Sequence, residues 1–150
     1  MKVAVGADHA GYLLKERVKG YLESHGHTVL DMGTNSTEST DYPQYAFRVA
    51  EAVRDGVADR GVLVCDTGNG IAIAANKVEG IRAALVIDPK HAEMSRRHND
   101  ANVLVLGSAI LPEALEAPTL DAWFSAPFDG GRHARRIAQI LDYERTHERR

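Results

Sequence analysis

Short apolar runs alternate with helical segments along the whole chain, and this alternation constrains the fold more than any other feature. The apolar runs cover residues 2–7, 27–32, 61–65, 81–87 and 101–107. The helical segments cover residues 10–24, 43–55, 71–77, 89–98, 112–125 and about 132–148. Parallel strands need a crossover between them, and a helix commonly supplies it. The pattern therefore predicts a three-layer α/β/α, Rossmann-like domain with a five-stranded parallel sheet, whose strand order stays open.

Length and composition limit the class of protein. The 150 residues suit one domain, and a net charge of −3 gives no reason to expect nucleic acid or an anionic membrane as partner. The single cysteine excludes an internal disulfide and fits a reducing compartment. The chain has no apolar run long enough for a membrane span, and its start lacks a signal-peptide layout. We expect a cytoplasmic protein.

The stretch from residue 61 to residue 77 predicts an anion site. A buried strand ends at Cys65, a glycine turn follows, and a helical segment begins near Ile71. The turn contains Asp66, Thr67, Gly68, Asn69 and Gly70. Unpaired amides and the positive end of the helix dipole would meet there, which favours an anion. An ordinary turn is the alternative. The turn matches neither the dinucleotide fingerprint nor a Walker loop.

Cys65 allows two interpretations. A cysteine at the end of a buried strand commonly serves as a small hydrophobic residue. The field of the following helix start favours a reactive thiolate, whereas the neighbouring carboxylate of Asp66 disfavours a second negative charge. Either Asp66 points away or the thiol acts as a weaker acid.

Further candidate residues follow or precede strands. Asp8 and His9 come directly after the first strand, so they share the carboxyl edge of the sheet with Cys65. His98 and Asn99 come just before the fifth strand, so they reach that edge only by the helix end or from a second chain. Helix capping for Asp8 and solvation for the histidines are the simpler alternatives.

The C-terminal segment is basic. Its arginines are Arg132, Arg135, Arg136, Arg145, Arg149 and Arg150. Arg132 and Arg136 are four residues apart and share a helix face, which is either solvated or a pair of forked donors for a phosphate. The chain has no H-E-x-x-H, and one cysteine cannot start a C-x-x-C site, so we expect no metal.

Taken together, these stretches resemble the family of type B ribose-5-phosphate isomerases, which also includes galactose-6-phosphate and allose-6-phosphate isomerases. The resemblance spans nearly the whole chain in the expected order. The matching stretches are Gly6-Ala7-Asp8-His9-Ala10-Gly11, Asp41-Tyr42-Pro43, Cys65-x-Thr67-Gly68-x-Gly70-Ile71, Ala74-Ala75-Asn76-Lys77, Gly80-Ile81-Arg82-Ala83, Arg97-His98-Asn99-Asp100-Ala101-Asn102 and Gly130-Gly131-Arg132-His133.

The resemblance implies a homodimer, with each active site built from both chains and the helix at about 132–148 packing on the partner. It implies interconversion of an aldose phosphate and its ketose without metal or other cofactor. Cys65 would move the proton between C1 and C2, and the amides of residues 66–70, with Asn99, would hold the enediolate.

The family pattern also implies roles for the remaining residues. Thr67 and Asp8 would handle hydroxyl protons, and His98 would open the furanose ring. The phosphate would bind His9, Arg132 and Arg136, which anchors and orients the small sugar. Tyr42 would line the pocket.

Two departures from the family pattern leave the sugar open. Asp66 stands where the family usually has glycine, and Gly107-Ser108-Ala109 lacks the arginine that often follows the fifth strand. We predict an isomerase of ribose 5-phosphate and ribulose 5-phosphate, in the pentose phosphate pathway. The alternatives are an isomerase of another aldose, such as allose 6-phosphate, galactose 6-phosphate or a free sugar, and a sugar-phosphate-binding module without catalysis. A nucleotide-binding domain would need the glycine fingerprint that the chain lacks. Dimer or tetramer also stays open.

Overall fold

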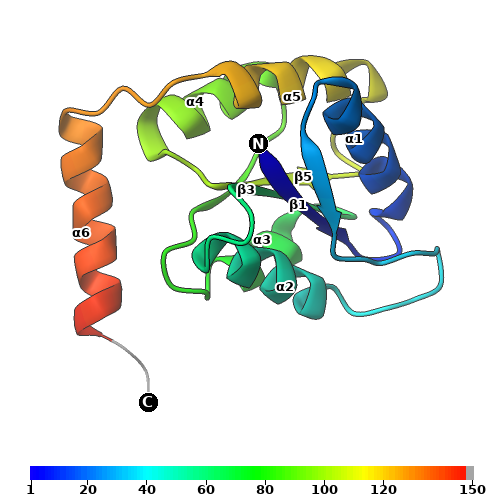
Figure 1. Cartoon of the computed structure of the whole chain (residues 1–150), viewed down its shortest axis with the longest axis horizontal. Helices are drawn as coiled ribbons and strands as arrows, with labels where there is room; N and C mark the ends of the chain where they lie inside the picture. Colours follow the sequence, from blue (N-terminus) through cyan, green and yellow to red (C-terminus); the bar gives the residue numbers. More distant parts are fainter. Residues whose placement is uncertain (148–150) are drawn as a thin grey trace.

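A parallel sheet lies between two layers of helices (Figure 1). The computed structural model describes residues 1–147. The strands are β1 (Lys2–Ala7), β2 (Thr28–Asp31), β3 (Arg60–Cys65), β4 (Ala83–Leu85) and β5 (Val103–Gly107), in the spatial order β2-β1-β3-β5-β4. Every neighbouring pair is parallel. The predicted three-layer fold with a five-stranded parallel sheet is confirmed.

Each face of the sheet has its own hydrophobic core. One core packs α2 (Tyr42–Arg54) and α3 (Asn69–Ala75) against the sheet. The other packs α1 (Tyr12–Ser24), α4 (Pro89–Asn99) and α5 (Glu116–Ser125) against the opposite face, around the fully buried Trp123. The central strands β1, β3 and β5 are apolar on both faces because helices cover both.

The path of the chain reverses between β1 and β3, and we refer to the carboxyl ends of these two strands with the loops that follow them as the crevice. From β1 the chain moves outward to β2 through α1, and from β3 it moves in the opposite direction through α3. The two connections lie on opposite faces of the sheet. Ligands bind at such a reversal, outside the carboxyl ends of the strands.

Several predicted elements differ from the structure at their ends. The helix predicted at 71–77 is α3, Asn69–Ala75, so Asn69 and Gly70 belong to its first turn, and the strand predicted at 101–107 begins at Val103. The strand predicted at 81–87 is only Ala83–Leu85, because the Arg82 amide donates to the Asn102 side chain and Ile81 lies in a turn. The helix predicted at 112–125 starts as a short 3₁₀ turn, Glu113–Leu115, before α5. The last helix, α6, spans Arg132–Thr146; Glu148, Arg149 and Arg150 lie outside the described residues.

Helix α6 stands apart from the three layers (Figure 1). It contacts the rest of the chain through α4 and through Glu144, which accepts a hydrogen bond from the Gly80 amide at 3.0 Å. Its face exposes Ile140 and Tyr143, whose exposed fractions are 52% and 64%. Within residues 1–147, no helix is both long and apolar enough to cross a bilayer.

Candidate active site

The ends of β1 and β3 bring two predicted site residues together. The register pairs Ala7 with Val64, so Asp8 and Cys65 follow at the same level of the sheet. The Gly11 amide donates to the Asp8 carboxylate at 3.0 Å, which buries Asp8 and fixes it. At Gly11 the backbone comes so close to β3 that an added Cβ would lie 2.4 Å from the Val64 carbonyl oxygen. The carboxylate and the thiol thus border one crevice.

Cys65 is nearly buried and its sulfur is held by the turn that follows. The Gly68 amide donates to Sγ at 3.2 Å, and the residue is 5% exposed. Gly68 has a φ of +85°, a conformation that glycine adopts without strain and that aims its amide back at the sulfur. An amide donating to sulfur stabilises negative charge there.

The other turn residues are arranged for a ligand in different ways. The Asn69 amide donates to the Thr67 hydroxyl oxygen at 3.2 Å. With the Gly68 amide on the sulfur, the amides without an intrahelical acceptor are those at the start of α3, including Gly70. The ring of Tyr42 lies directly over Gly70, where an added Cβ would come within 2.6 Å of the ring. Tyr42 therefore lies at the mouth of the turn, and its role in lining the substrate pocket stays a prediction.

His9 is oriented by a loop. The Thr40 amide donates to Nδ1 of His9 at 3.1 Å, which assigns the proton of the neutral ring to Nε2. That nitrogen is left as the donor toward a ligand. Asp66 is exposed, and among residues 1–147 its carboxylate forms no ion pair.

Ser108 connects the parts of the crevice, and sequence reasoning missed this role. Its hydroxyl contacts the carbonyl oxygens of Ala10 and Cys65 at 3.0 and 3.2 Å, so it links the end of β5 to the loops after β1 and β3. The only signal in the sequence was its position directly after the fifth strand.

His98, Asn99, Arg132 and Arg136 lie elsewhere in the same chain. The Asn99 carbonyl accepts from Arg82, which precedes β4, so the end of α4 lies at the amino edge of the sheet. Gly61 pairs with Val103 at that edge, and Cys65 pairs with Gly107 at the other. Four strand residues separate the two levels by about 13 Å along the sheet. One chain does not bring these residues to Cys65.

This second group includes two residues that the sequence interpretation gave no role. His98, Asp129 and His133 each place a nitrogen or oxygen within 4.8 Å of the others. Burial, the nearby His98 and the guanidinium groups of Arg132 and Arg136 lower the pKa of His133. The stretch Gly130-Gly131-Arg132-His133 was the available sequence signal for His133. A groove of about 380 Å³ opens between α6 and the β4 edge, and its lining includes Asn99 and Ile137.

Comparison with known proteins settles the family. The family model described as ribose/galactose isomerase matches residues 3–140, nearly the whole chain. The chain belongs to this family. Ribose-5-phosphate isomerase B of Escherichia coli K12 is 48% identical over 143 residues, which cover 95% of this chain and 96% of that protein. The predicted family is confirmed.

Solved structures of ribose/galactose isomerase relatives agree with the fold. Ribose-5-phosphate isomerase B of Clostridium thermocellum superposes with a TM-score of 0.97 at 47% identity, covering 99% of this chain and 100% of that one. The enzyme of Mycoplasma genitalium, solved with bound ribulose 5-phosphate, gives a TM-score of 0.91 at 40% identity, covering 96% of both chains. The isomerase family thus keeps this architecture over its full length.

Proposed function

We propose that this protein interconverts ribose 5-phosphate and ribulose 5-phosphate through an enediolate. The observation that carries the proposal is Cys65, held at the crevice by the Gly68 amide, in a chain 48% identical to an isomerase of that name. We further propose that it works in the cytoplasm, in the pentose phosphate pathway.

The reaction needs a base, an oxyanion partner and a proton donor. In the aldose-to-ketose direction, the Cys65 thiolate takes the proton from C2. The electron pair of that C–H bond forms the C1–C2 double bond, and the C1 carbonyl oxygen becomes the enediolate oxygen. The amides of the turn hold that oxygen, and Cys65 returns the proton to C1. The O2 hydroxyl proton passes to O1, so that O2 becomes the ketose carbonyl oxygen and O1 becomes a hydroxyl group. Thr67 and Asp8 handle the hydroxyl protons.

The remaining roles require a second copy of the chain. His98 would open the furanose ring, Asn99 would contact the enediolate, and Arg132 and Arg136 with His9 would hold the phosphate. In one chain these groups divide between opposite edges of the sheet. We therefore propose a homodimer in which α6 of one copy carries its arginines to the crevice of the other. The exposed Ile140 and Tyr143 on α6 support an interface there.

The role of Cys65 has a direct test. Cys65→Ala should abolish exchange of the C2 proton with solvent, because it removes the single thiol of the chain and with it the proposed base. Proton NMR of ribose 5-phosphate in D₂O measures this exchange, and thermal unfolding checks that the variant folds. Exchange near the wild-type rate would reject Cys65 as the base.

A second candidate is an isomerase of another aldose, and two residues favour it. Asp66 adds a negative charge to the turn, and Ala109 stands where the family often has an arginine. An activity screen against pentose phosphates, hexose phosphates and the free sugars separates the candidates. If kcat/KM is highest for allose 6-phosphate or galactose 6-phosphate, that sugar replaces ribose 5-phosphate as the proposed substrate. If the protein binds these sugars but converts none of them, the result favours a binding module.

A further inference from the structure

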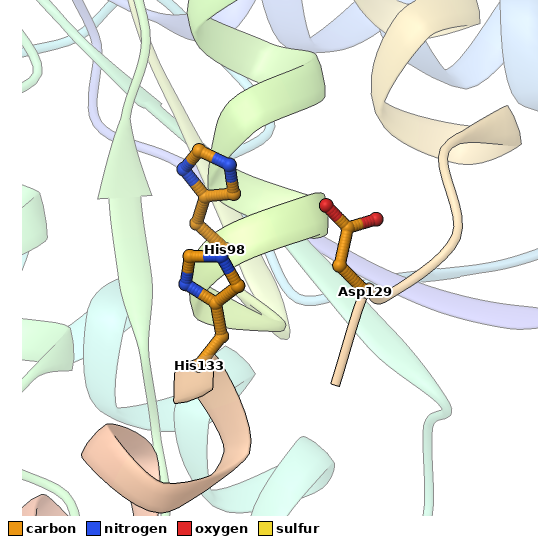
Figure 2. A group of neighbouring side chains, drawn as sticks. All are labelled: His98, Asp129 and His133. Carbon is orange, nitrogen blue, oxygen red and sulfur yellow. The ribbon is translucent and has the colours of Figure 1, made fainter. Parts of the chain in front are cut away.

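Three potential metal ligands meet where α4 ends and α6 begins. His98 comes from the last turn of α4, Asp129 from the loop before α6, and His133 from the first turn of α6. Their ligand atoms all lie within 4.8 Å of one another. Figure 2 shows the two rings one above the other with the Asp129 carboxylate to one side. The rings stack at 4.3 Å between centroids and 8° between planes.

The three side chains keep ligand atoms available for an ion. Across residues 1–147, neither imidazole ring has a hydrogen-bond partner. One carboxylate oxygen of Asp129 forms an ion pair with Nε of Arg97 at 3.2 Å, which leaves the other oxygen free in that pair. The Asp129 amide donates to the Arg97 carbonyl at 3.0 Å, so the loop is anchored to α4. Rotation of one imidazole ring is the rearrangement that brings the set onto one ion.

The charges around the cluster select the kind of ion. Arg132 and Arg136 repel a cation, but both are exposed, so water and salt screen the repulsion. Ions held by weak attraction to carboxylates, such as Mg²⁺, would lose to this repulsion. Ions that bind imidazole strongly would not, and two histidines with one carboxylate suit Zn²⁺, Ni²⁺ and Cu²⁺.

We propose that His98, Asp129 and His133 form a binding site for a divalent transition ion of this class, with Zn²⁺ as its first candidate. Because stacked rings aim their lone pairs in parallel, one imidazole turns about its Cβ–Cγ bond when the ion binds. The site leaves coordination positions for water. One consequence rests on the proposed function. The bound ion occupies His98, which is proposed to open the furanose ring, so Zn²⁺ inhibits turnover of the cyclic sugar.

Calorimetric titration of the chelator-treated, full-length protein with Zn²⁺ tests the site. The wild type should bind one ion per chain. His133→Asn and Asp129→Asn should each weaken binding by about tenfold or more, since each removes one ligand. His91→Asn, on the exposed first turn of α4, is the matched control and should bind like the wild type. Thermal unfolding without metal checks each fold.

Two outcomes would overturn the inference. Equal Zn²⁺ affinity in the wild type and both ligand variants would reject the site, as would the absence of binding. The absorption spectrum of the Co²⁺-loaded wild type gives a check without substitution, because nitrogen ligation in a tetrahedral site produces intense visible bands. Zn²⁺ binding at these residues without loss of activity would instead reject the link to His98 and leave the metal site standing.

Discussion

The tautomer of the neutral His9 ring is set by a backbone amide far away in the sequence. The Thr40 amide donates to Nδ1 across 31 residues, so the neutral ring presents Nε2–H. A protonated ring could instead donate from Nδ1 to the Thr40 carbonyl, which lies at 3.2 Å. The same loop thus accommodates both forms of His9, and in each form Nε2 carries a proton suited to an anionic group.

Gly70 offers a test of the pocket wall. Its φ is not positive, so alanine fits the backbone, but the new Cβ would meet the Tyr42 ring. We expect Gly70→Ala to displace Tyr42 and raise the KM for the sugar phosphate roughly fivefold, because positioning of the substrate is lost. Steady-state kinetics measure this.

Gly20→Ala on α1 is the matched control for that substitution, since nothing lies within 4 Å of an added Cβ there. Its KM should equal that of the wild type. A normal KM in Gly70→Ala would mean that Tyr42 does not line the occupied pocket.

At the residue scale, contacts between residues close in the sequence were predictable, and contacts between residues far apart in the sequence were not. Cys65 and Gly68 are close in sequence, so a strand-turn-helix pattern predicts their neighbourhood. Ser108 contacts Ala10 across 98 residues, and no local pattern reveals such a contact. His133 and Asp129 were missed for the same reason, because their meeting with His98 depends on how α6 starts.

At the scale of elements, a buried charge network holds α1 to β2. Lys15 is fully buried and donates to the Asp31 carboxylate at 2.8 and 2.9 Å, and Lys19 donates to it as well. Burial pushes the pKa of Asp31 upward, but the hydrogen bonds from Lys15, Lys19 and the Gly33 amide outweigh it and lower the pKa. The network therefore stabilises the fold only while Asp31 is ionised.

Asp31→Asn should lower the free energy of unfolding at pH 7 by about 1–3 kcal/mol, because it removes the carboxylate that accepts hydrogen bonds from the buried Lys15 and leaves only Glu16, at 3.2 Å, as a counter-ion. Since the pKa of Asp31 is lower when folded, its contribution is present above the unfolded value of about 4 and is lost as the pH falls through the folded value. The gap between wild type and variant should therefore narrow in acid.

Urea unfolding at neutral and acidic pH measures that gap. Asp55→Asn removes an exposed ion pair with Arg54 and serves as the control, with no measurable change expected. A gap that stays constant with pH would contradict the assignment to Asp31.

The sequence predicted which segments are strands and which are helices, but it did not predict the residues at which they begin and end. The alternation of apolar runs and helical segments identified all five strands. The strand was predicted too long, at 81–87, because residues 81 and 82 continue the strand pattern of the sequence. In the structure, the Ile81 amide donates to the Val78 carbonyl in a turn, and the Arg82 amide donates to the Asn102 side chain. The strand order also depends on long-range packing, which periodicity does not encode.

At the scale of the whole molecule, the division of the proposed site between two sheet edges predicts complementation. Cys65→Ala and His98→Asn homodimers should each be inactive. Mixed dimers pair an intact Cys65 from one copy with an intact His98 from the other at one of their two sites. Random reassortment of equal amounts should therefore restore about a quarter of wild-type activity.

Activity after unfolding and refolding the mixture together measures this complementation. Refolding each variant alone and then combining them is the control. No recovery, with mixed dimers demonstrated by mass, would mean that Cys65 and His98 act within one chain.

The outer edge of β4 has its own consequence for assembly. The side-chain amide of Asn76 donates to the Ala83 carbonyl at 2.9 Å and accepts from the Ala83 amide at 2.8 Å. These two hydrogen bonds are the pair that a neighbouring strand would make with Ala83, so the Ala83 amide and carbonyl are not available to pair with a strand of another chain. Growth of the sheet into a continuous intermolecular ribbon is therefore blocked at this position of β4.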